Sequence, residues 1–97
     1  MRIVGRDELA GFSSVHADAR EWIANWLADA EAARWQTPQE IKRSYASASF
    51  LPHNLVIFNV KGNRYRLEVQ IAYQTGVVVV RWVGTHAEYT KRLSRKP

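Results

Sequence analysis

The segment GTHAEYTKR contains residue types that phosphate chemistry requires. His86 and Tyr89 are three positions apart, and Arg81 precedes them in the run VVVVRWV. Residues three apart lie on one side of a helix, so a helix that begins here would present the imidazole and the phenol together. A neutral histidine can accept a proton as a general base, and a guanidinium group can bind phosphate through paired hydrogen bonds. The segment therefore predicts an acid-base pair beside an anion-binding side chain.

Other groups nearby have simpler interpretations. Thr85 and Glu88 have the spacing of a helix capping box, so we expect Glu88 to cap the helix rather than to act in catalysis. Nothing in the sequence converges on His16 or His53, which are interpreted as structural or merely exposed. The three histidines lack metal-ligand spacing, and the chain has no phosphate-binding glycine loop or nucleophile motif. We therefore predict no metal and no cofactor.

Two hairpins must carry the cations. Segments 55–60, 64–73 and 77–83 have the composition of strands, and Gly62-Asn63 is typical of a two-residue turn. That turn pairs Asn59 with Arg66 and directs alternate side chains to an apolar face, which must pack on the helices. The opposite face is polar and mostly cationic, with Asn59, Lys61, Arg64, Arg66, Glu68 and Gln70.

The second hairpin decides where Arg81 points. A two-residue loop at Thr75-Gly76 directs Arg81 outward, opposite Gln70, whereas a three-residue loop would bury it. Burying an unpaired cation is very costly, so we predict the shorter loop. This register places Val78, Val80 and Trp82 on the apolar face and Val77, Val79 and Val83 on the outer face. The three outer valines would then need cover from the tail or from a partner protein.

The first half of the chain supplies the helices. Residues 1–4 are predicted to form a strand, 7–12 a short helix ended by Ser13-Ser14, and 17–35 a longer helix with Trp22 and Trp26 in the core. Thr37-Pro38-Gln39-Glu40 predicts a capping box and a helix over 38–45, and 46–54 is predicted to be a loop. The predicted fold is α+β, of order β-α-α-(α)-β-β-β, with helices packed on one face of a small antiparallel sheet. One domain is expected over residues 1–97, with the order of the tail after about residue 93 left open.

Charge is distributed unevenly along the 97 residues, whose net charge is +5. Residues 1–60 contain six Lys/Arg and seven Asp/Glu, giving −1, whereas residues 61–97 contain eight and two, giving +6. A basic half suits nucleic acid or an acidic protein surface, although a solvated basic face would have the same composition. The absence of cysteine fits a reducing cytoplasm, and no segment has the apolar length of a membrane span or signal peptide.

Arg64, Arg66 and Arg81 are thus expected together on the outer face of the sheet. Like charges that are opposite or diagonal on a sheet repel one another. A bound phosphate would relieve this repulsion by accepting bidentate hydrogen bonds from the guanidinium groups. The alternative is that Glu68 and Glu88 neutralise part of the cluster.

The segments SASFLPHNLVIFNVKGNRYRLEV and VRWVGTHAEYTK resemble the HigB family of bacterial toxins, within the RelE-like superfamily. The most specific parts are FN-x-KGN-x-YRL and R-x-x-GTHAEY, and the resemblance covers nearly the whole chain. It implies a RelE-like fold and a metal-independent endoribonuclease that cleaves mRNA, typically on the translating ribosome. It also implies a partner, a HigA-type antitoxin with a helix-turn-helix domain.

The resemblance further implies a role for each candidate site residue. Arg66 and Arg81 would hold the phosphate, His86 and Tyr89 would be acid and base in unassigned order, and Lys61 and Arg64 would position RNA backbone. Asn59 is a candidate to orient one of these side chains. Helix 17–34 mixes acidic and basic residues, whereas some RelE-like toxins have a lysine-rich early helix that grips the ribosome. Helix 17–34 therefore lacks the lysine-rich pattern of a ribosome-gripping helix.

Two other functions stay open from the sequence. A non-catalytic module of similar fold could coat RNA or poison gyrase, and aromatic side chains on the outer face would favour RNA coating. The predicted outer face lacks them, because Tyr65 and Tyr73 point into the core. An acidic antitoxin segment could also cover the outer valines and neutralise the arginines, which is compatible with nuclease activity.

Overall fold

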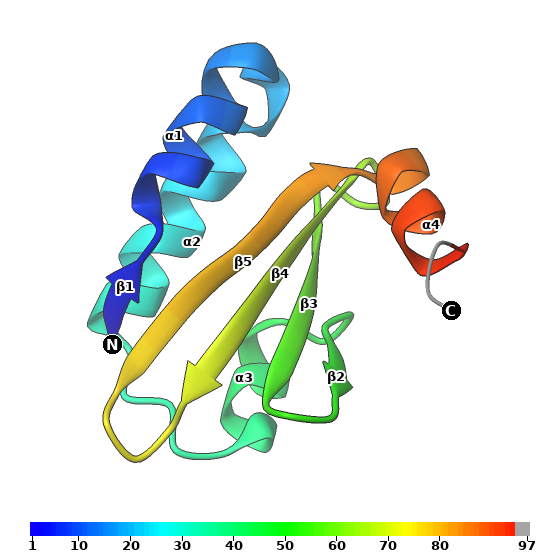
Figure 1. The fold of residues 1–97 in the computed structure, drawn as a ribbon. Coiled ribbons are helices and arrows are strands. Elements are labelled where there is room, and N and C mark those ends of the chain that lie inside the picture. The colour runs from blue at the N-terminus through cyan, green and yellow to red at the C-terminus, as the bar shows by residue number, and fades with distance from the viewer. Residues whose placement is uncertain (95–97) are drawn as a thin grey trace.

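A mixed sheet of five strands and four α-helices make up the described residues, 1–94, of the computed structural model (Figure 1). In chain order the elements are β1 (Arg2–Val4), α1 (Arg6–Val15), the 3-10 turn η1 (Ala17–Ala19), α2 (Arg20–Ala32), α3 (Pro38–Ser44), β2 (Ser49–Leu51), β3 (Leu55–Val60), β4 (Tyr65–Ala72), β5 (Val77–Thr85) and α4 (His86–Ser94). The strand order is β1-β5-β4-β3-β2, with β1 parallel to β5 and the other pairs antiparallel. The predicted α+β class is confirmed, and the parallel β1 makes the sheet mixed. Of the tail left open by the sequence, residues 95–97 lie outside the described range.

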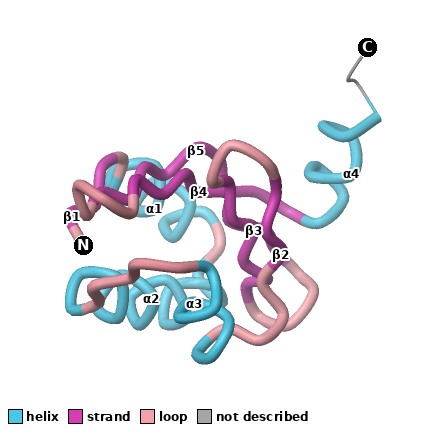
Figure 2. The backbone as a smooth tube through the Cα atoms, turned by 90° about the horizontal axis from the view of Figure 1, so that it is seen from below, coloured by secondary structure: helices cyan, strands magenta, loops and turns pink. Residues whose placement is uncertain are grey.

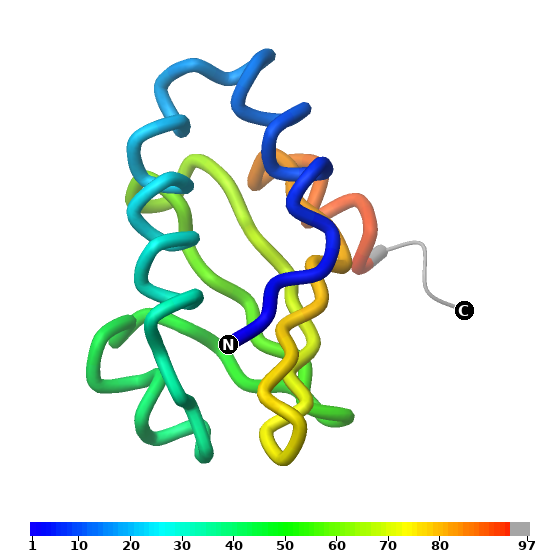
Figure 3. The backbone as a smooth tube through the Cα atoms, turned by 90° about the vertical axis from the view of Figure 1, so that its left-hand side faces the viewer, coloured from blue at the N-terminus to red at the C-terminus, as the bar shows by residue number. Residues whose placement is uncertain are grey.

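The hydrophobic core lies between the sheet and helices α2 and α3, which occupy one side of the strands (Figure 2). Trp26 of α2 is fully buried, and its ring meets Phe58 of β3 at a centroid distance of 5.5 Å. Trp22 is partly buried against the same core, so the prediction for both tryptophans is confirmed. Helix α4 lies on the other side of the strands from α2 (Figure 3). The two faces of the sheet therefore have different neighbours.

Helix α1 is longer than predicted. It continues through Ser13-Ser14, where Ser14 Oγ donates to the carbonyl oxygen of Gly11 at 2.8 Å and leaves the helix intact. Beyond the helix, His16 stacks on Phe12 with ring centroids 4.4 Å apart. Both rings meet Tyr65 of β4, at 5.2 Å for Phe12 and 5.1 Å for His16. These aromatic contacts fix the end of α1 against the start of β4.

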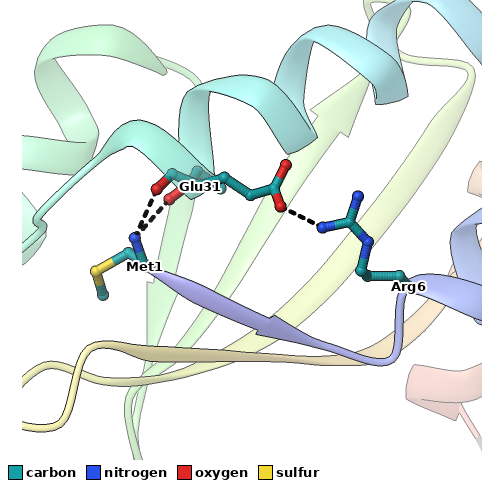
Figure 4. A network of polar contacts seen from close by, with 4 residues as sticks. Met1, Arg6 and Glu31 are labelled. Carbon is teal, nitrogen blue, oxygen red and sulfur yellow. Dashed lines mark hydrogen bonds and ion pairs between the residues drawn. The ribbon is translucent and has the colours of Figure 1, made fainter.

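Helix α2 is shorter than predicted and ends at Ala32 rather than residue 35. The α-amino group of Met1 donates to the carbonyl oxygens of Ala30, Glu31 and Ala33 at 3.0, 3.1 and 2.6 Å. Carbonyls in the last turn of a helix lack partners within the helix, so these bonds stabilise its end. Arg6 forms an ion pair with the Glu31 side chain in the same region, as Figure 4 shows. The first residues of the chain therefore stabilise the C-terminal end of α2.

Two further predictions for the middle of the chain need correction. Segment 46–54, predicted to be a loop, contains the edge strand β2, which is too short to give a periodic signal. The capping box predicted at Thr37 forms only in part, because the Thr37 side chain makes no capping hydrogen bond. Glu40 Oε1 instead accepts from the backbone N–H of Gln36 at 3.2 Å. Helix α3 still begins at Pro38, as predicted.

The strand register is correct for one hairpin and wrong for the other. Asn59 pairs with Arg66 in the β3–β4 ladder, as predicted. In the β4–β5 ladder Ala72 pairs with Val77, so residues 73–76 form the connection, and a bulge between Glu68 and Val69 leaves Arg81 without an opposite residue. An extra residue in one strand reverses the side-chain alternation beyond it. The predicted positions of Trp82 and Val83 are therefore wrong.

The bulge exchanges the faces of these two residues. Trp82 pairs with Glu68 on the outer face, and Val83 pairs with Leu67 and packs against the core. Val77 and Val79 stay on the outer face as predicted, since they precede the bulge. The outer face thus carries Trp82, an aromatic residue that was predicted to lie on the apolar face.

Candidate functional site

Helix α4 begins with the predicted capping box. The backbone N–H of Glu88 donates to Thr85 Oγ1 at 3.1 Å, and the backbone N–H of Thr85 donates to Glu88 Oε1 at 2.8 Å. The bond from the Thr85 backbone lowers the pKa of Glu88, because it stabilises the charged carboxylate. Glu88 is therefore a cap, as predicted. The first turn that it stabilises carries His86 and Tyr89.

His86 and Arg66 lie at the same end of the sheet. Arg66 pairs with Gly84 in the β4–β5 ladder, two residues before His86. The backbone N–H of His86 donates to the carbonyl oxygen of Arg64 at 2.9 Å, which joins the start of α4 to the start of β4. The His86 side chain is exposed, and Tyr89 is half-buried. The fold thus holds an imidazole and an arginine-bearing strand at one edge of the molecule.

Neutral acceptors hold the Arg66 guanidinium group. It donates to Asn63 Oδ1 at 3.0 Å, to the Asn63 carbonyl at 3.4 Å and to the Tyr65 carbonyl at 3.2 Å. Within residues 1–94 it has no carboxylate partner. Its charge therefore remains available to an anion, while its orientation is restricted by Asn63, a residue that the sequence reasoning treated only as part of a turn.

Arg64 has a different environment from Arg66. Its guanidinium group forms a 2.9 Å ion pair with Asp18 of η1, and the Tyr65 hydroxyl donates to the other oxygen of Asp18 at 2.6 Å. The hydrogen bond from Tyr65, together with the nearby Arg64, lowers the pKa of Asp18. The same hydrogen bond raises the pKa of Tyr65. One cation of the expected cluster is thus already paired, by an acidic residue that the sequence did not indicate.

Arg81 is the extra residue of the β5 bulge and is exposed. In the part of the chain that the structure describes, its side chain forms no hydrogen bond or ion pair. The prediction that it lies opposite Gln70 is wrong, because Gln70 pairs with Val79. It precedes Gly84 by three residues, or about 10 Å along a strand.

Lys61 and Asn59 lie around the turn between β3 and β4. Lys61 is exposed and has a left-handed backbone conformation, with φ of 53°. The Asn59 amide nitrogen donates to the Ser47 carbonyl at 3.3 Å, a contact toward the segment before β2. These two residues border the surface that carries Arg66.

An aromatic and cationic stack fixes α4 on the outer face. The guanidinium carbon of Arg92 lies 4.8 Å from the centre of the Trp82 ring, and its nitrogen lies 3.4 Å from Glu68 Oε1. The Tyr89 ring of α4 also contacts the Trp82 ring, with 6.0 Å between their centroids. We call Trp82, Arg92 and Glu68 the α4 latch. The sequence did not indicate this contact, because the bulge is what turns Trp82 outward.

The predicted site residues line neither of the two cavities described next. A shallow cavity of about 350 Å³ between β5 and α4 is lined by Trp82, Val83, Glu88, Lys91 and Arg92. A larger one, of about 530 Å³, lies around Met1, Trp35 and Tyr73 and contains none of the predicted site residues. Exposed cations such as Lys61 and Arg81, which lie outside these cavities, suit a polymeric anion better than a small enclosed substrate.

Among residues 1–94 no three histidine, aspartate or glutamate side chains are grouped so that they could hold a metal ion. Across the same residues, every helix is too short or too polar to cross a membrane.

Comparison with known proteins gives one family. A family model described as HigB_toxin, RelE-like toxic component of a toxin-antitoxin system, matches residues 19–92. The matched segment covers more than half of the chain and includes every residue predicted for the site. No curated protein matches the chain. The family match confirms the resemblance found in the sequence motifs.

Proposed function

Because the chain belongs to the HigB family of RelE-like toxins, we propose that it is an endoribonuclease that cleaves mRNA. Family membership makes it the toxin of a toxin-antitoxin system. The nuclease activity is supported by one observation above all: Arg66, free of any carboxylate among the described residues, is paired with Gly84, two residues before His86.

The proposed reaction uses the substrate's own 2′-hydroxyl group. Its oxygen forms a bond to the adjacent phosphorus while the bond from phosphorus to the 5′-oxygen breaks, leaving a 2′,3′-cyclic phosphate and a 5′-hydroxyl end. One member of the pair His86 and Tyr89 takes the proton from the 2′-hydroxyl, and the other donates a proton to the leaving oxygen. No metal takes part in this proposal.

In the proposed reaction, the arginines stabilise the negative charge of the transition state. Negative charge builds up on the phosphorane oxygens, and preorganised cations there lower the barrier. Arg66 and Arg81 take this role, while Lys61 and Arg64 contact the RNA backbone and Asn59 borders the same surface. Arg66 is already oriented by Asn63, so little reorganisation is needed when the phosphate binds.

Cleavage of a reporter transcript tests this proposal. Wild type, His86→Ala and His53→Asn are compared in a translation extract and with ribosome-free RNA. His53 is an exposed histidine in the β2–β3 turn with φ of 66°, a conformation that asparagine tolerates. We expect His86→Ala to reduce cleavage roughly 10²–10³-fold and His53→Asn to leave it unchanged. Normal cleavage by a folded His86→Ala protein would show that the site is wrongly assigned.

A second candidate is a non-catalytic toxin that binds RNA or a protein such as gyrase. Trp82 supplies the outer-face aromatic ring that the RNA-binding version calls for, but Arg92 and Tyr89 already pack against this ring, so a base would have to displace α4 to stack on it. Such a binder would retard the transcript in a gel and leave it intact. Cleavage products in the wild-type reaction would exclude it.

The proposal extends to location and partners. The toxin acts in the cytoplasm, where mRNA and ribosomes are present, and its activity is expected at the translating ribosome. The antitoxin that neutralises it is of the HigA type, with a helix-turn-helix domain. The ribosome-free arm of the cleavage experiment tests the ribosome requirement.

A further inference from the structure

One row of side chains crosses all five strands on the face of the sheet opposite the core. In the register of the strands, the row consists of Val4, Val79, Gln70, Leu55 and Leu51, each beside the next. Four of the five are apolar. Val4 and Leu51, at the two ends, are each 40% exposed, and Val79 and Leu55 are half-buried. We call these residues the outer row.

The outer row is an exposed apolar strip next to a strip that is already covered. Helix α4 packs on the neighbouring row, where the α4 latch joins Arg92 to Trp82 and Glu68. The outer row has exposed ends, and Val77 adds a further partly exposed apolar side chain beside it. Apolar side chains thus gather on both sides of Gln70, and grouped apolar surface marks a site of interaction more often than scattered single residues do.

Two cations flank the outer row. On one side of the row, Arg2 of β1 pairs with Val77. On the other side, Arg81 lies at the bulge of β5. Both are exposed, and within the described residues neither side chain forms an ion pair. The four steps from Val77 to Arg81 along β5 span about 13 Å. A complementary partner therefore has an apolar stripe with carboxylates on both sides of it.

We propose that the outer row is where the antitoxin binds, through an acidic amphipathic helix laid across the strands. Neighbouring strands are about 4.8 Å apart, close to the 5.4 Å pitch of an α-helix, so apolar residues one turn apart meet successive strands. Five strands span about 19 Å, which corresponds to a helix of roughly 13 residues. The chain belongs to a family of toxins from toxin-antitoxin systems, so the partner proposed for this surface is the antitoxin.

This position also accounts for inhibition. A helix on the outer row reaches Arg81, one of the residues proposed to hold the phosphate, and places a carboxylate beside it. The antitoxin would neutralise the toxin from the side of Arg81 without contacting His86. The inference rests on the toxin-antitoxin pairing and deepens the proposed function by naming how this site is silenced.

The test compares binding of the cognate antitoxin, the protein whose co-expression relieves growth arrest, to four toxin variants. Val79→Glu changes an interior position of the outer row, and Val4→Glu and Leu51→Glu change its ends. Val15→Glu is the matched control, since Val15 is 76% exposed but belongs to α1. We expect each outer-row variant to weaken binding about tenfold or more, and Val15→Glu to change it less than about twofold. If Val79→Glu fails to fold, the two end variants carry the test, because their sites are already exposed.

Growth and salt dependence give independent readouts. Outer-row variants should still arrest growth but escape rescue by the antitoxin, and Arg2→Ala should reduce the loss of affinity caused by added salt. Wild-type binding by all three outer-row variants overturns the inference. A toxin dimer that Val79→Glu dissolves also overturns it, because a second copy then occupies the row. A toxin that binds its antitoxin as expected yet cleaves no RNA would refute the nuclease proposal and leave this one standing.

Discussion

The Trp82 ring occupies the space that a side chain at Gly84 would need. A β-carbon at Gly84 would lie 2.5 Å from Trp82 Cζ2 and 2.8 Å from Glu88 Oε1. The indole and the capping carboxylate therefore both approach the backbone of β5 at the position beside Arg66. This close approach couples the α4 latch to the start of α4, where His86 lies.

Gly84→Ala should destabilise the protein for this reason. The added methyl group forces either the indole or the capping carboxylate to move, and overpacking of this kind costs about 1–3 kcal/mol. Gly11→Ala is the matched control, since apart from its chain neighbours and the backbone of α1 nothing lies within 4 Å of its β-carbon position. In a helix that substitution should instead stabilise by about 0.5–1 kcal/mol. Urea unfolding of both variants measures the difference, and equal midpoints would contradict the packing that we describe.

The two threonines of the two capping-box motifs should differ in their contributions to stability. Thr85 Oγ1 accepts a hydrogen bond from the Glu88 backbone, whereas Thr37 makes no side-chain cap. Thr85→Ala should therefore cost about 1 kcal/mol of unfolding free energy. Thr37→Ala should cost clearly less. Thermal unfolding under one set of conditions compares them, and a larger loss at Thr37 would show that the caps are assigned the wrong way round.

How far the sequence predicted the fold depends on whether a feature is local. The β3–β4 register followed from alternation and the Gly62-Asn63 turn, and the α4 cap followed from the spacing of Thr85 and Glu88. The β4–β5 register did not, because valines occupy both faces of β5 and nothing in VVVVRWV shows that Arg81 is an extra residue. Because of this single bulge, the predicted position of Trp82 was wrong.

Contacts between distant segments were also beyond the sequence. Asp18 is 46 residues before Arg64, and no local pattern indicates that η1 lies against the start of β4. His16, interpreted as structural or exposed, proves to stack on Phe12 and Tyr65. The types of the candidate site residues could be read from the sequence, whereas the groups that hold or neutralise them could not.

Asp18 should make the stability of the protein depend on acid pH. Its pKa is lowered in the folded protein by the Tyr65 hydroxyl and Arg64, from an ordinary value of 3.8. A lowered carboxyl pKa means stability that is present above the unfolded pKa and lost as pH falls through the folded one. Asp18→Asn should therefore flatten the fall in stability below about pH 4. Urea unfolding of wild type and variant from pH 6 to pH 2 measures this, and parallel curves would contradict it.

The hydroxyl of Tyr65 should give a matching effect at alkaline pH. Its pKa is raised by the hydrogen bond to Asp18, so its contribution is present below the ordinary value of 10.0 and lost as pH rises through the folded pKa. Tyr65→Phe removes the ionisable group but keeps the ring that meets Phe12 and His16. Unfolding midpoints from pH 8 upward should fall more steeply for wild type than for Tyr65→Phe. The reverse order would show that the hydroxyl is not held by Asp18.

The three arginines should differ in their effect on RNA cleavage because their partners differ. Arg66 is bound by neutral acceptors and Arg81 has no partner among residues 1–94, whereas Arg64 is paired with Asp18. Single-turnover cleavage should therefore fall roughly 10²–10³-fold in Arg66→Ala and Arg81→Ala, the size of effect typical of one lost transition-state contact. Arg64→Ala should fall about tenfold or less, because a cation already held by a carboxylate has less charge to offer the RNA. Binding to RNA with a 2′-deoxy nucleotide at the cleavage position separates affinity from chemistry. A loss in Arg64→Ala as large as that in Arg66→Ala would mean that RNA displaces Asp18, and Asp18→Asn should then increase cleavage.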